Sequence, residues 1–66
     1  MCTIEVGEAM VCDVALPAVR AAVALDAGTV VREELVPGQG TRLQLVEGDL
    51  GTFVARVRAA VAEVNR

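Results

Sequence analysis

The chain has 66 residues, 55% of them apolar, and carries nine acidic and six basic residues for a net charge of −3. The bases are all arginine and are not clustered, and Phe53 is the only aromatic residue, which argues against nucleic-acid binding. No run of about 18 apolar residues is present, so no membrane span is predicted. We expect a single cytoplasmic domain over residues 1–66.

The residue types available for catalysis are few. The sequence contains no histidine and no lysine, which removes the usual general base, the commonest metal ligand and every lysine-borne prosthetic group. Two thiols and scattered carboxylates remain, and two cysteines without a signal-peptide pattern do not make a disulfide framework. We therefore expect a protein that binds partners, is not an enzyme and holds no permanent cofactor.

The first part of the chain has the period of β-strands. Thr3–Val6 is a short apolar alternation that ends at Gly7. Met10–Leu16 alternates more clearly, and it places Cys12 on the apolar face formed by the even-numbered residues. Cys12 is therefore predicted to be a small core residue. Pro17 stops or bends this strand.

The middle of the chain contains one ambiguous segment and two clear strands. Ala18–Asp26 is rich in alanine, which favours a helix, but its length and its flanking Pro and Gly suit a strand equally well. We favour a strand over Ala21–Leu25. Thr29–Val36 is rich in β-branched residues and Thr41–Glu47 alternates, so both are predicted strands. The turn Pro37–Gly40 joins them.

The last segment, residues 49–65, has the clearest pattern. Asp49 is a suitable N-cap, and apolar residues then recur at helical spacing. These residues are Leu50, Phe53, Val54, Val57, Val61 and Val64. Short strands over residues 3–47 followed by one amphipathic C-terminal helix predict a mainly β fold, a small barrel that the helix caps or flanks.

Cys2 and the adjacent acids Glu33 and Glu34 are candidate site residues. Cys2 follows Met1, which is expected to be trimmed, so that the mature chain would begin with Cys2. A free amine beside the thiol favours the thiolate, which suits a soft metal such as iron. The alternative is that Cys2 has no role. Glu33 and Glu34 are neighbours in a predicted strand, so they point to opposite faces and are interpreted as solvated charges.

Glu8–Met10 and the later Gly28–Val31 are similar to segments of biotinyl and lipoyl carrier domains. Those domains need a lysine where this chain has Val11, so attachment of a prosthetic group is excluded. On this resemblance the chain would be a lysine-less relic of that barrel.

Four blocks of the sequence occur in a fixed order along almost its whole length. They are Met1-Cys2 with Gly7, Asp26–Glu33, Leu35–Pro37 and Gly40–Gly48. With the amphipathic helix that follows, they resemble the HypC/HupF family of nickel–iron hydrogenase maturation chaperones. Three family positions differ, since the proline before the first glycine, the phenylalanine after the aspartate and the functional histidine are here Val6, Ala27 and Val46.

This resemblance implies a small OB-like β-barrel with a C-terminal helix. It also implies a cytoplasmic chaperone that binds a HypD-like scaffold protein and then the precursor of the hydrogenase large subunit. Cys2 would transiently hold iron that carries cyanide and carbon monoxide ligands, and Cys2 and Gly7 would contact the partner.

A structural role in a larger complex is the alternative from a different class. The apolar helix stripe and the final strands resemble the small β–α subunits of the KEOPS tRNA-modification assembly (Pcc type). That interpretation gives Cys2 no role and predicts stable homodimers or heterodimers.

Overall fold

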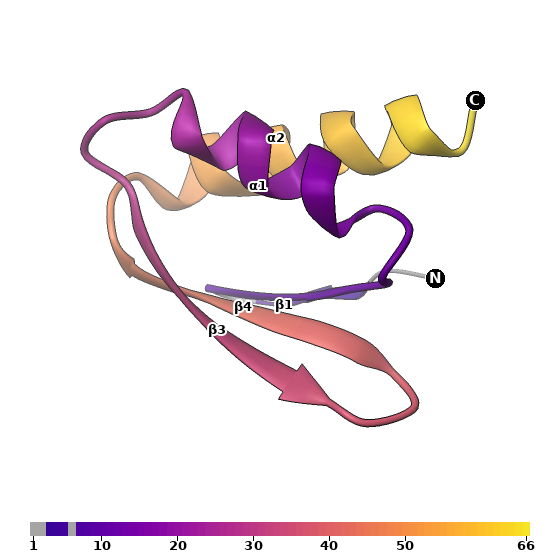
Figure 1. The fold of residues 1–66 in the computed structure, drawn as a ribbon. Coiled ribbons are helices and arrows are strands. Elements are labelled where there is room, and N and C mark those ends of the chain that lie inside the picture. Colours follow the sequence, from indigo (N-terminus) through magenta and orange to yellow (C-terminus); the bar gives the residue numbers. More distant parts are fainter. Residues whose placement is uncertain (1–2, 6) are drawn as a thin grey trace.

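The structure is a computed structural model that describes residues 3–5 and 7–66. Within these residues an antiparallel sheet carries two helices on one face (Figure 1). In chain order the elements are β1 (Thr3–Glu5), β2 (Glu8–Val11), α1 (Leu16–Ala24), β3 (Val30–Val36), β4 (Gly40–Glu47) and α2 (Leu50–Val64).

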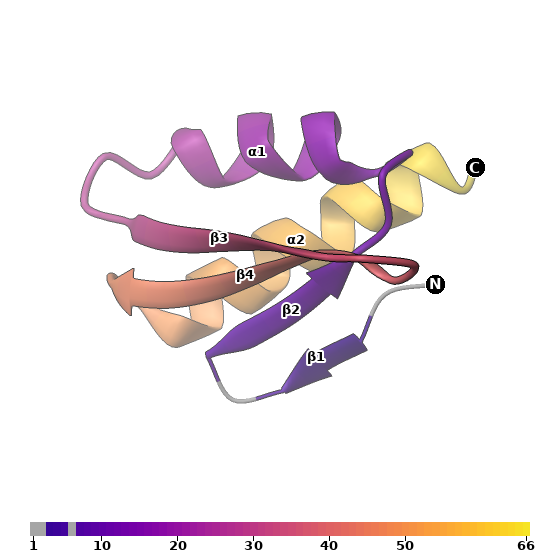
Figure 2. The ribbon, with the colours of Figure 1, turned by 60° about the horizontal axis from the view of Figure 1, so that its bottom comes forward.

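The strand order in the sheet is β1-β2-β4-β3, and each neighbouring pair is antiparallel. β2 and β3 therefore run in the same direction with β4 between them, which is a split β-α-β arrangement. α1 makes the connection from β2 to β3 and lies on one face of the sheet (Figure 2). This crossover leaves β3 at one edge of the sheet and the short β1 at the other.

The predicted barrel is wrong, because the sheet is open. In the part of the chain that the structure describes, β1 pairs only with β2, and β3 pairs only with β4. The helices cover the face that a barrel would enclose, so the apolar side chains of that face are buried without closure. The coarser prediction, a mainly β fold with a C-terminal helix, is confirmed for the strands and for α2, and α1 is a second helix that it did not include.

Residues Leu16–Ala24 form α1, so the predicted strand over Ala21–Leu25 is wrong. Pro17 lies in the first helical turn, where its missing N–H has no partner to lose and its fixed φ suits a helix. Val19 and Val23 are four residues apart and are both buried, which is the helical period. The helix has only nine residues, and a segment this short carries too few repeats to separate helix from strand.

β2 ends at Val11, and its buried face is the opposite of the predicted one. Ala9 and Val11 are 0% exposed, whereas Val14 is 77% exposed. A turn follows β2 directly, and in it the carbonyl of Cys12 accepts a hydrogen bond from the N–H of Ala15 at 3.0 Å. The strand alternation stops there, and Cys12 is half-buried beside the core instead of within it.

The core lies between the helices and the two central strands, β2 and β4. Its fully buried apolar side chains are Ala9, Val11, Ala15, Val19, Val23, Leu43, Phe53, Val57 and Ala60. Phe53 is the largest of them, and burying such a side chain contributes about 1.5–3 kcal/mol. The free energy of unfolding of a folded domain is only about 5–15 kcal/mol, so this contribution is a substantial share of it. Leu50 belongs to the predicted helix stripe but is 40% exposed.

The β3–β4 hairpin closes through a tight turn. Pro37 and Gly38 occupy its two central positions, and Gly38 has φ +77. The N–H of Gln39 donates to the carbonyl of Val36 at 3.0 Å. Proline followed by a positive-φ glycine, with this hydrogen bond, is the pattern of a type II turn. The turn fixes the register of the hairpin and brings the start of β4 against β2.

Gly40→Ala is expected to lower the free energy of unfolding by at least about 1 kcal/mol. Gly40 has φ +119, and a Cβ there would lie 2.3 Å from the carbonyl oxygen of Val11. Gly28→Ala is the matched control, because nothing lies within 4 Å of a Cβ at that position. Chemical denaturation measures both variants. Equal destabilisation by the two changes would contradict the close packing of β4 against β2.

Candidate interaction surface

β3 is an edge strand whose outer side faces solvent. It is seven residues long, and β4 is its one strand partner among the described residues. Leu35 is 72% exposed and Val30 is 46% exposed. An edge strand presents a row of unpaired N–H and C=O groups, which is a template for pairing with another strand. β3 therefore combines a backbone ladder with exposed apolar side chains.

The turn determines which backbone groups of β3 point outward. The carbonyl of Val36 accepts from Gln39 within the turn, so the polar groups of Val36 face toward β4. Backbone groups alternate in direction along a strand, so those of Leu35, Glu33 and Val31 face away from β4. The backbone N–H and C=O groups of these three alternate residues are therefore available for hydrogen bonds to a further strand.

The shape of the hairpin keeps the end of β3 away from the helices. The register shifts near the start of β3, where Val30 lies opposite Glu47 and Val31 opposite Leu45, so that β4 has one extra residue, as in a β-bulge. Bulges increase the local twist and change the direction of a strand. In Figure 1 the turn end of the hairpin lies away from the helix layer, which agrees with the high exposure of Leu35.

A cleft of about 320 Å³ separates α1 from β3. Its lining residues are Arg20, Val23, Ala24, Thr29, Val31, Glu33 and Leu43. Arg20 binds Glu33 in a bidentate ion pair, with Nε 3.0 Å from Oε2 and Nη2 2.6 Å from Oε1. These hydrogen bonds lower the pKa of Glu33 and raise that of Arg20. The pair ties α1 to the middle of the edge strand.

A second depression, of about 330 Å³, lies where the β3–β4 turn meets the end of β2. Its lining residues are Cys12, Asp13, Leu35, Val36, Pro37, Gly38, Gln39 and Gly40. Because Leu35 belongs both to the edge and to this lining, the exposed apolar surface of β3 continues into the depression.

The face of the sheet opposite the helices is charged. Nη1 of Arg42 donates to Oε1 of Glu34 at 2.7 Å across the β3–β4 pair. Arg32 lies opposite Gln44 and forms no ion pair with any residue that the structure describes. Glu33 and Glu34 thus bind arginines on opposite faces, which confirms the prediction that these neighbours diverge.

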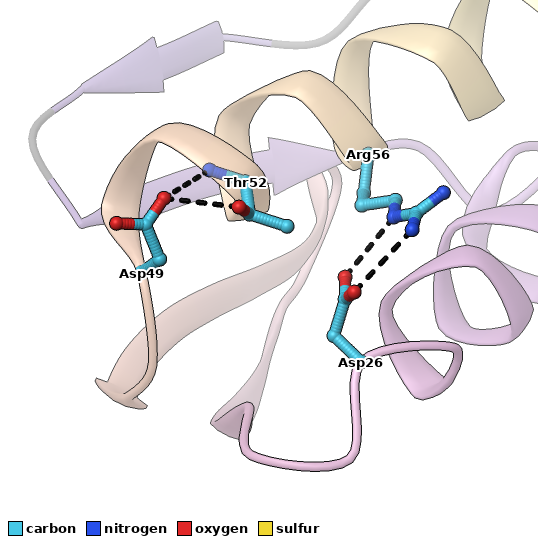
Figure 3. A network of polar contacts seen from close by, with 4 residues as sticks. All are labelled: Asp26, Asp49, Thr52 and Arg56. Carbon is cyan, nitrogen blue, oxygen red and sulfur yellow. Dashed lines mark hydrogen bonds and ion pairs between the residues drawn. The ribbon is translucent and has the colours of Figure 1, made fainter.

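Two polar contacts fix α2 and the loop that leads into β3 (Figure 3). Oδ2 of Asp49 accepts from the N–H and Oγ1 of Thr52 at 2.8 and 2.9 Å, which confirms Asp49 as the N-cap and lowers its pKa. Nε and Nη2 of Arg56 donate to Asp26 at 3.0 and 3.3 Å, which raises the pKa of Arg56. Asp26 follows α1, so α2 holds the point from which the chain turns into β3.

Of the cysteines and glycine singled out in the sequence, the structure describes Gly7 and Cys12. Cys2 lies outside the described residues. Gly7 lies directly before β2 and Cys12 directly after it, so the length of the strand separates them. Gly7 has φ +74, and its carbonyl accepts from the N–H of Leu45 at 2.7 Å, so backbone geometry accounts for a glycine there. Among the side chains that the structure describes, those of residues 7–66, no group of three or more Cys, Asp or Glu is placed to hold a metal ion.

Comparisons with protein-family models, with curated proteins and with solved structures found no match to this chain. Neither α1 nor α2 is long and apolar enough to cross a membrane. Function is therefore inferred from the sequence and from β3 with its surroundings.

Sequence reasoning missed the edge strand, although the sequence carries a signal for it. Arg32, Glu33 and Glu34 place three consecutive charges at the centre of an otherwise apolar, β-branched strand. Edge strands use charges in this way to limit unwanted pairing. A charged centre in a β-branched segment could therefore have assigned β3 to an edge.

Glu33→Gln is expected to lower the melting temperature at neutral pH, because it removes the charge that Arg20 binds. Folding lowers the pKa of Glu33, so its ionised form stabilises the fold above the ordinary carboxyl pKa. This stabilisation is lost as the pH falls through the lowered pKa of Glu33 in the folded chain. Below that pH, Glu33→Gln and wild type should have the same melting temperature.

Glu47→Gln is the control, since Glu47 is exposed on β4 and has no ion pair in the described part of the chain. Thermal melts over a pH series measure the difference from wild type. A difference for Glu33→Gln that persists unchanged at the acid end of the series would contradict the role of the ion pair.

Proposed function

We propose that the chain is a non-catalytic subunit of a protein assembly and that it joins its partner by strand addition along the outer side of β3. The observation that carries this proposal is a seven-residue edge strand on which Leu35 is 72% exposed. Strand addition takes affinity from main-chain hydrogen bonds and specificity from alternate side chains. The KEOPS resemblance points to the same class of function, a structural subunit.

Other parts of the sheet fit a partner strand or surface less well. β1 is three residues long, so a ladder along it would be less than half the length of one along β3. The face opposite the helices carries Arg32, Glu34 and Arg42, and such charges are costly to cover unless each finds a partner.

A catalytic role has little support in the residues. The sequence contains neither histidine nor lysine. Five of its acids have partners within the chain: Asp26, Glu33, Glu34 and Glu63 bind arginines, and Asp49 caps α2. Association is therefore the function that the fold supports best.

Hydrogenase maturation is the second candidate, and the sequence favours it through Met1-Cys2 and the ordered blocks that resemble the HypC/HupF chaperones. The OB-like barrel of that family is not formed among the described residues. Cys2 as a site for iron with cyanide and carbon monoxide ligands stays a prediction from the sequence. The same holds for the HypD-like and hydrogenase-precursor partners.

The main proposal is tested by placing a photoreactive amino acid at position 35 or at position 46. Leu35 lies on the edge strand, whereas Val46 is 52% exposed on the central strand β4 and is the matched control. In cells that naturally produce the chain, irradiation is expected to cross-link position 35 to another polypeptide and to leave position 46 without a product. Mass analysis of the digested product identifies the partner. Cross-links at position 46 alone, or at neither position, would overturn strand addition at β3.

The chaperone candidate is tested by Cys2→Ser and Cys12→Ser in parallel. After anaerobic loading with ferrous ion, Cys2→Ser is expected to lose bound iron and to keep the melting temperature of wild type. Cys12 is half-buried against the core, so Cys12→Ser should cost about 1 kcal/mol of stability and retain iron. Metal analysis and thermal melts measure the two effects. Wild-type protein without bound iron, or Cys2→Ser with as much iron as wild type, would exclude this candidate.

A further inference from the structure

We infer that the strand that pairs with β3 is β3 of a second copy of this chain, in an antiparallel register with Glu33 opposite Glu33. The inference rests on the proposed function and deepens it by naming the partner. The pairing joins two four-stranded sheets into one continuous sheet, with the helices of both copies on the same face.

Two-fold symmetry restricts the possible registers. In a two-fold symmetric antiparallel pair, the same patch on each copy meets the other. Residues that lie opposite each other across the pair have their side chains on the same face of the sheet, so their positions differ by an even number of residues. With two-fold symmetry, the residue midway between two such positions lies opposite its own copy. Near the middle of β3 the choices are Arg32, Glu33 and Glu34. Each of these centres sets two like charges against each other at the axis, which is unfavourable, so the choice depends on the pairs beside the axis. Centring on Arg32 places Glu34 opposite Val30, and centring on Glu34 places Arg32 opposite Val36, so neither forms a pair of opposite charges.

The register centred on Glu33 is electrostatically complementary. It places Arg32 opposite Glu34 of the second copy, and the symmetry makes this pair twice. Arg32 has no ion pair among the described residues of one chain. Arg42 binds Oε1 of Glu34, which leaves Oε2 to accept from the second copy's Arg32. The two Glu33 carboxylates at the axis are each already bound by Arg20.

The same register covers the exposed apolar side chain of the edge. Leu35, which is 72% exposed in one chain, lies opposite Val31 of the second copy, so pairing removes apolar surface from water. The backbone groups of Val31, Glu33 and Leu35 face outward, and each meets an outward-facing counterpart in this register. Because the contact is two-fold symmetric, it uses both β3 edges and stops at two copies. The edges that are left are the three-residue β1 strands.

A charge-exchange experiment tests the partner and the register together. Arg32→Glu and Glu34→Arg are each expected to weaken self-association of the purified full-length chain by at least about tenfold, because each sets like charges opposite at two places. An equimolar mixture of the two variants should associate about as tightly as wild type, since both acids of one variant then face both arginines of the other. Sedimentation equilibrium measures the dissociation constants. Arg58→Glu, at an exposed position on α2, is the control for net charge and should leave association unchanged.

The outcomes separate this inference from the proposed function. Wild type that stays monomeric as its concentration rises, or a mixture that does not regain association, would overturn pairing with a second copy. A cross-link from position 35 to a different protein would also overturn it while keeping strand addition.

If circular dichroism shows that a charge variant is unfolded, the register is tested by cross-linking, in a mixture of isotope-labelled and unlabelled chains that carry the photoreactive amino acid at position 35. The expected product joins that position to Val31 of the other copy. A product at another residue, or no product between copies, contradicts the register.

Discussion

The packing of α2 on the two central strands is the contact on which the rest of the fold depends. Phe53 and Val57 of α2 lie in one buried cluster with Val11 of β2 and Leu43 of β4. A chain of 66 residues with one aromatic ring has apolar side chains for one such layer and no more. One face of the sheet is therefore covered by the helices, the other face carries charges, and the sheet does not close on itself.

The crossover through α1 then decides which strand is left at the edge. β4 pairs with both β2 and β3, so β3 is carried to the outside of the sheet. The Arg56–Asp26 pair fixes the loop before β3, and the Arg20–Glu33 pair fixes its middle. β3 is thus an ordered strand whose outer backbone groups have no strand partner in the described part of the chain. Order of this kind lowers the entropy cost of binding another strand. The charges that keep a lone edge strand soluble also determine which register of pairing is favourable.

Sequence patterns predicted the elements with long or clearly ended repeats, such as the helix Leu50–Val64 and the strands on either side of the Pro37–Gly40 turn. The patterns did not predict the helix Leu16–Ala24, because a nine-residue helix repeats its period too few times to be distinguished from a strand. The patterns also did not predict the strand order, since the spacing of strands along the chain does not say which strands become neighbours. The barrel prediction was wrong for that reason. The features of the candidate interaction surface also divide into those that a local pattern predicts and those that depend on the arrangement of the strands. The divergence of neighbouring glutamates follows from strand geometry, whereas the edge position of β3 follows from the crossover. Gly7 is explained by its backbone conformation, and Cys2 lies outside the described residues.

The most direct test of the central claim is amide hydrogen exchange along β3 as a function of protein concentration, because exchange reports local opening and protection residue by residue. In dilute solution, the amides of Val31, Glu33 and Leu35 are expected to exchange rapidly, while those of the central strands β2 and β4 are protected. As the concentration rises, the three β3 amides are expected to become protected together, because the second copy supplies their acceptors. Protection of these amides in solutions dilute enough for the chain to sediment as a monomer would indicate that β3 has a second strand partner within its own chain, as in a closed barrel. Rapid exchange at every concentration would show that β3 does not pair with another copy, and either result would contradict this description of the molecule.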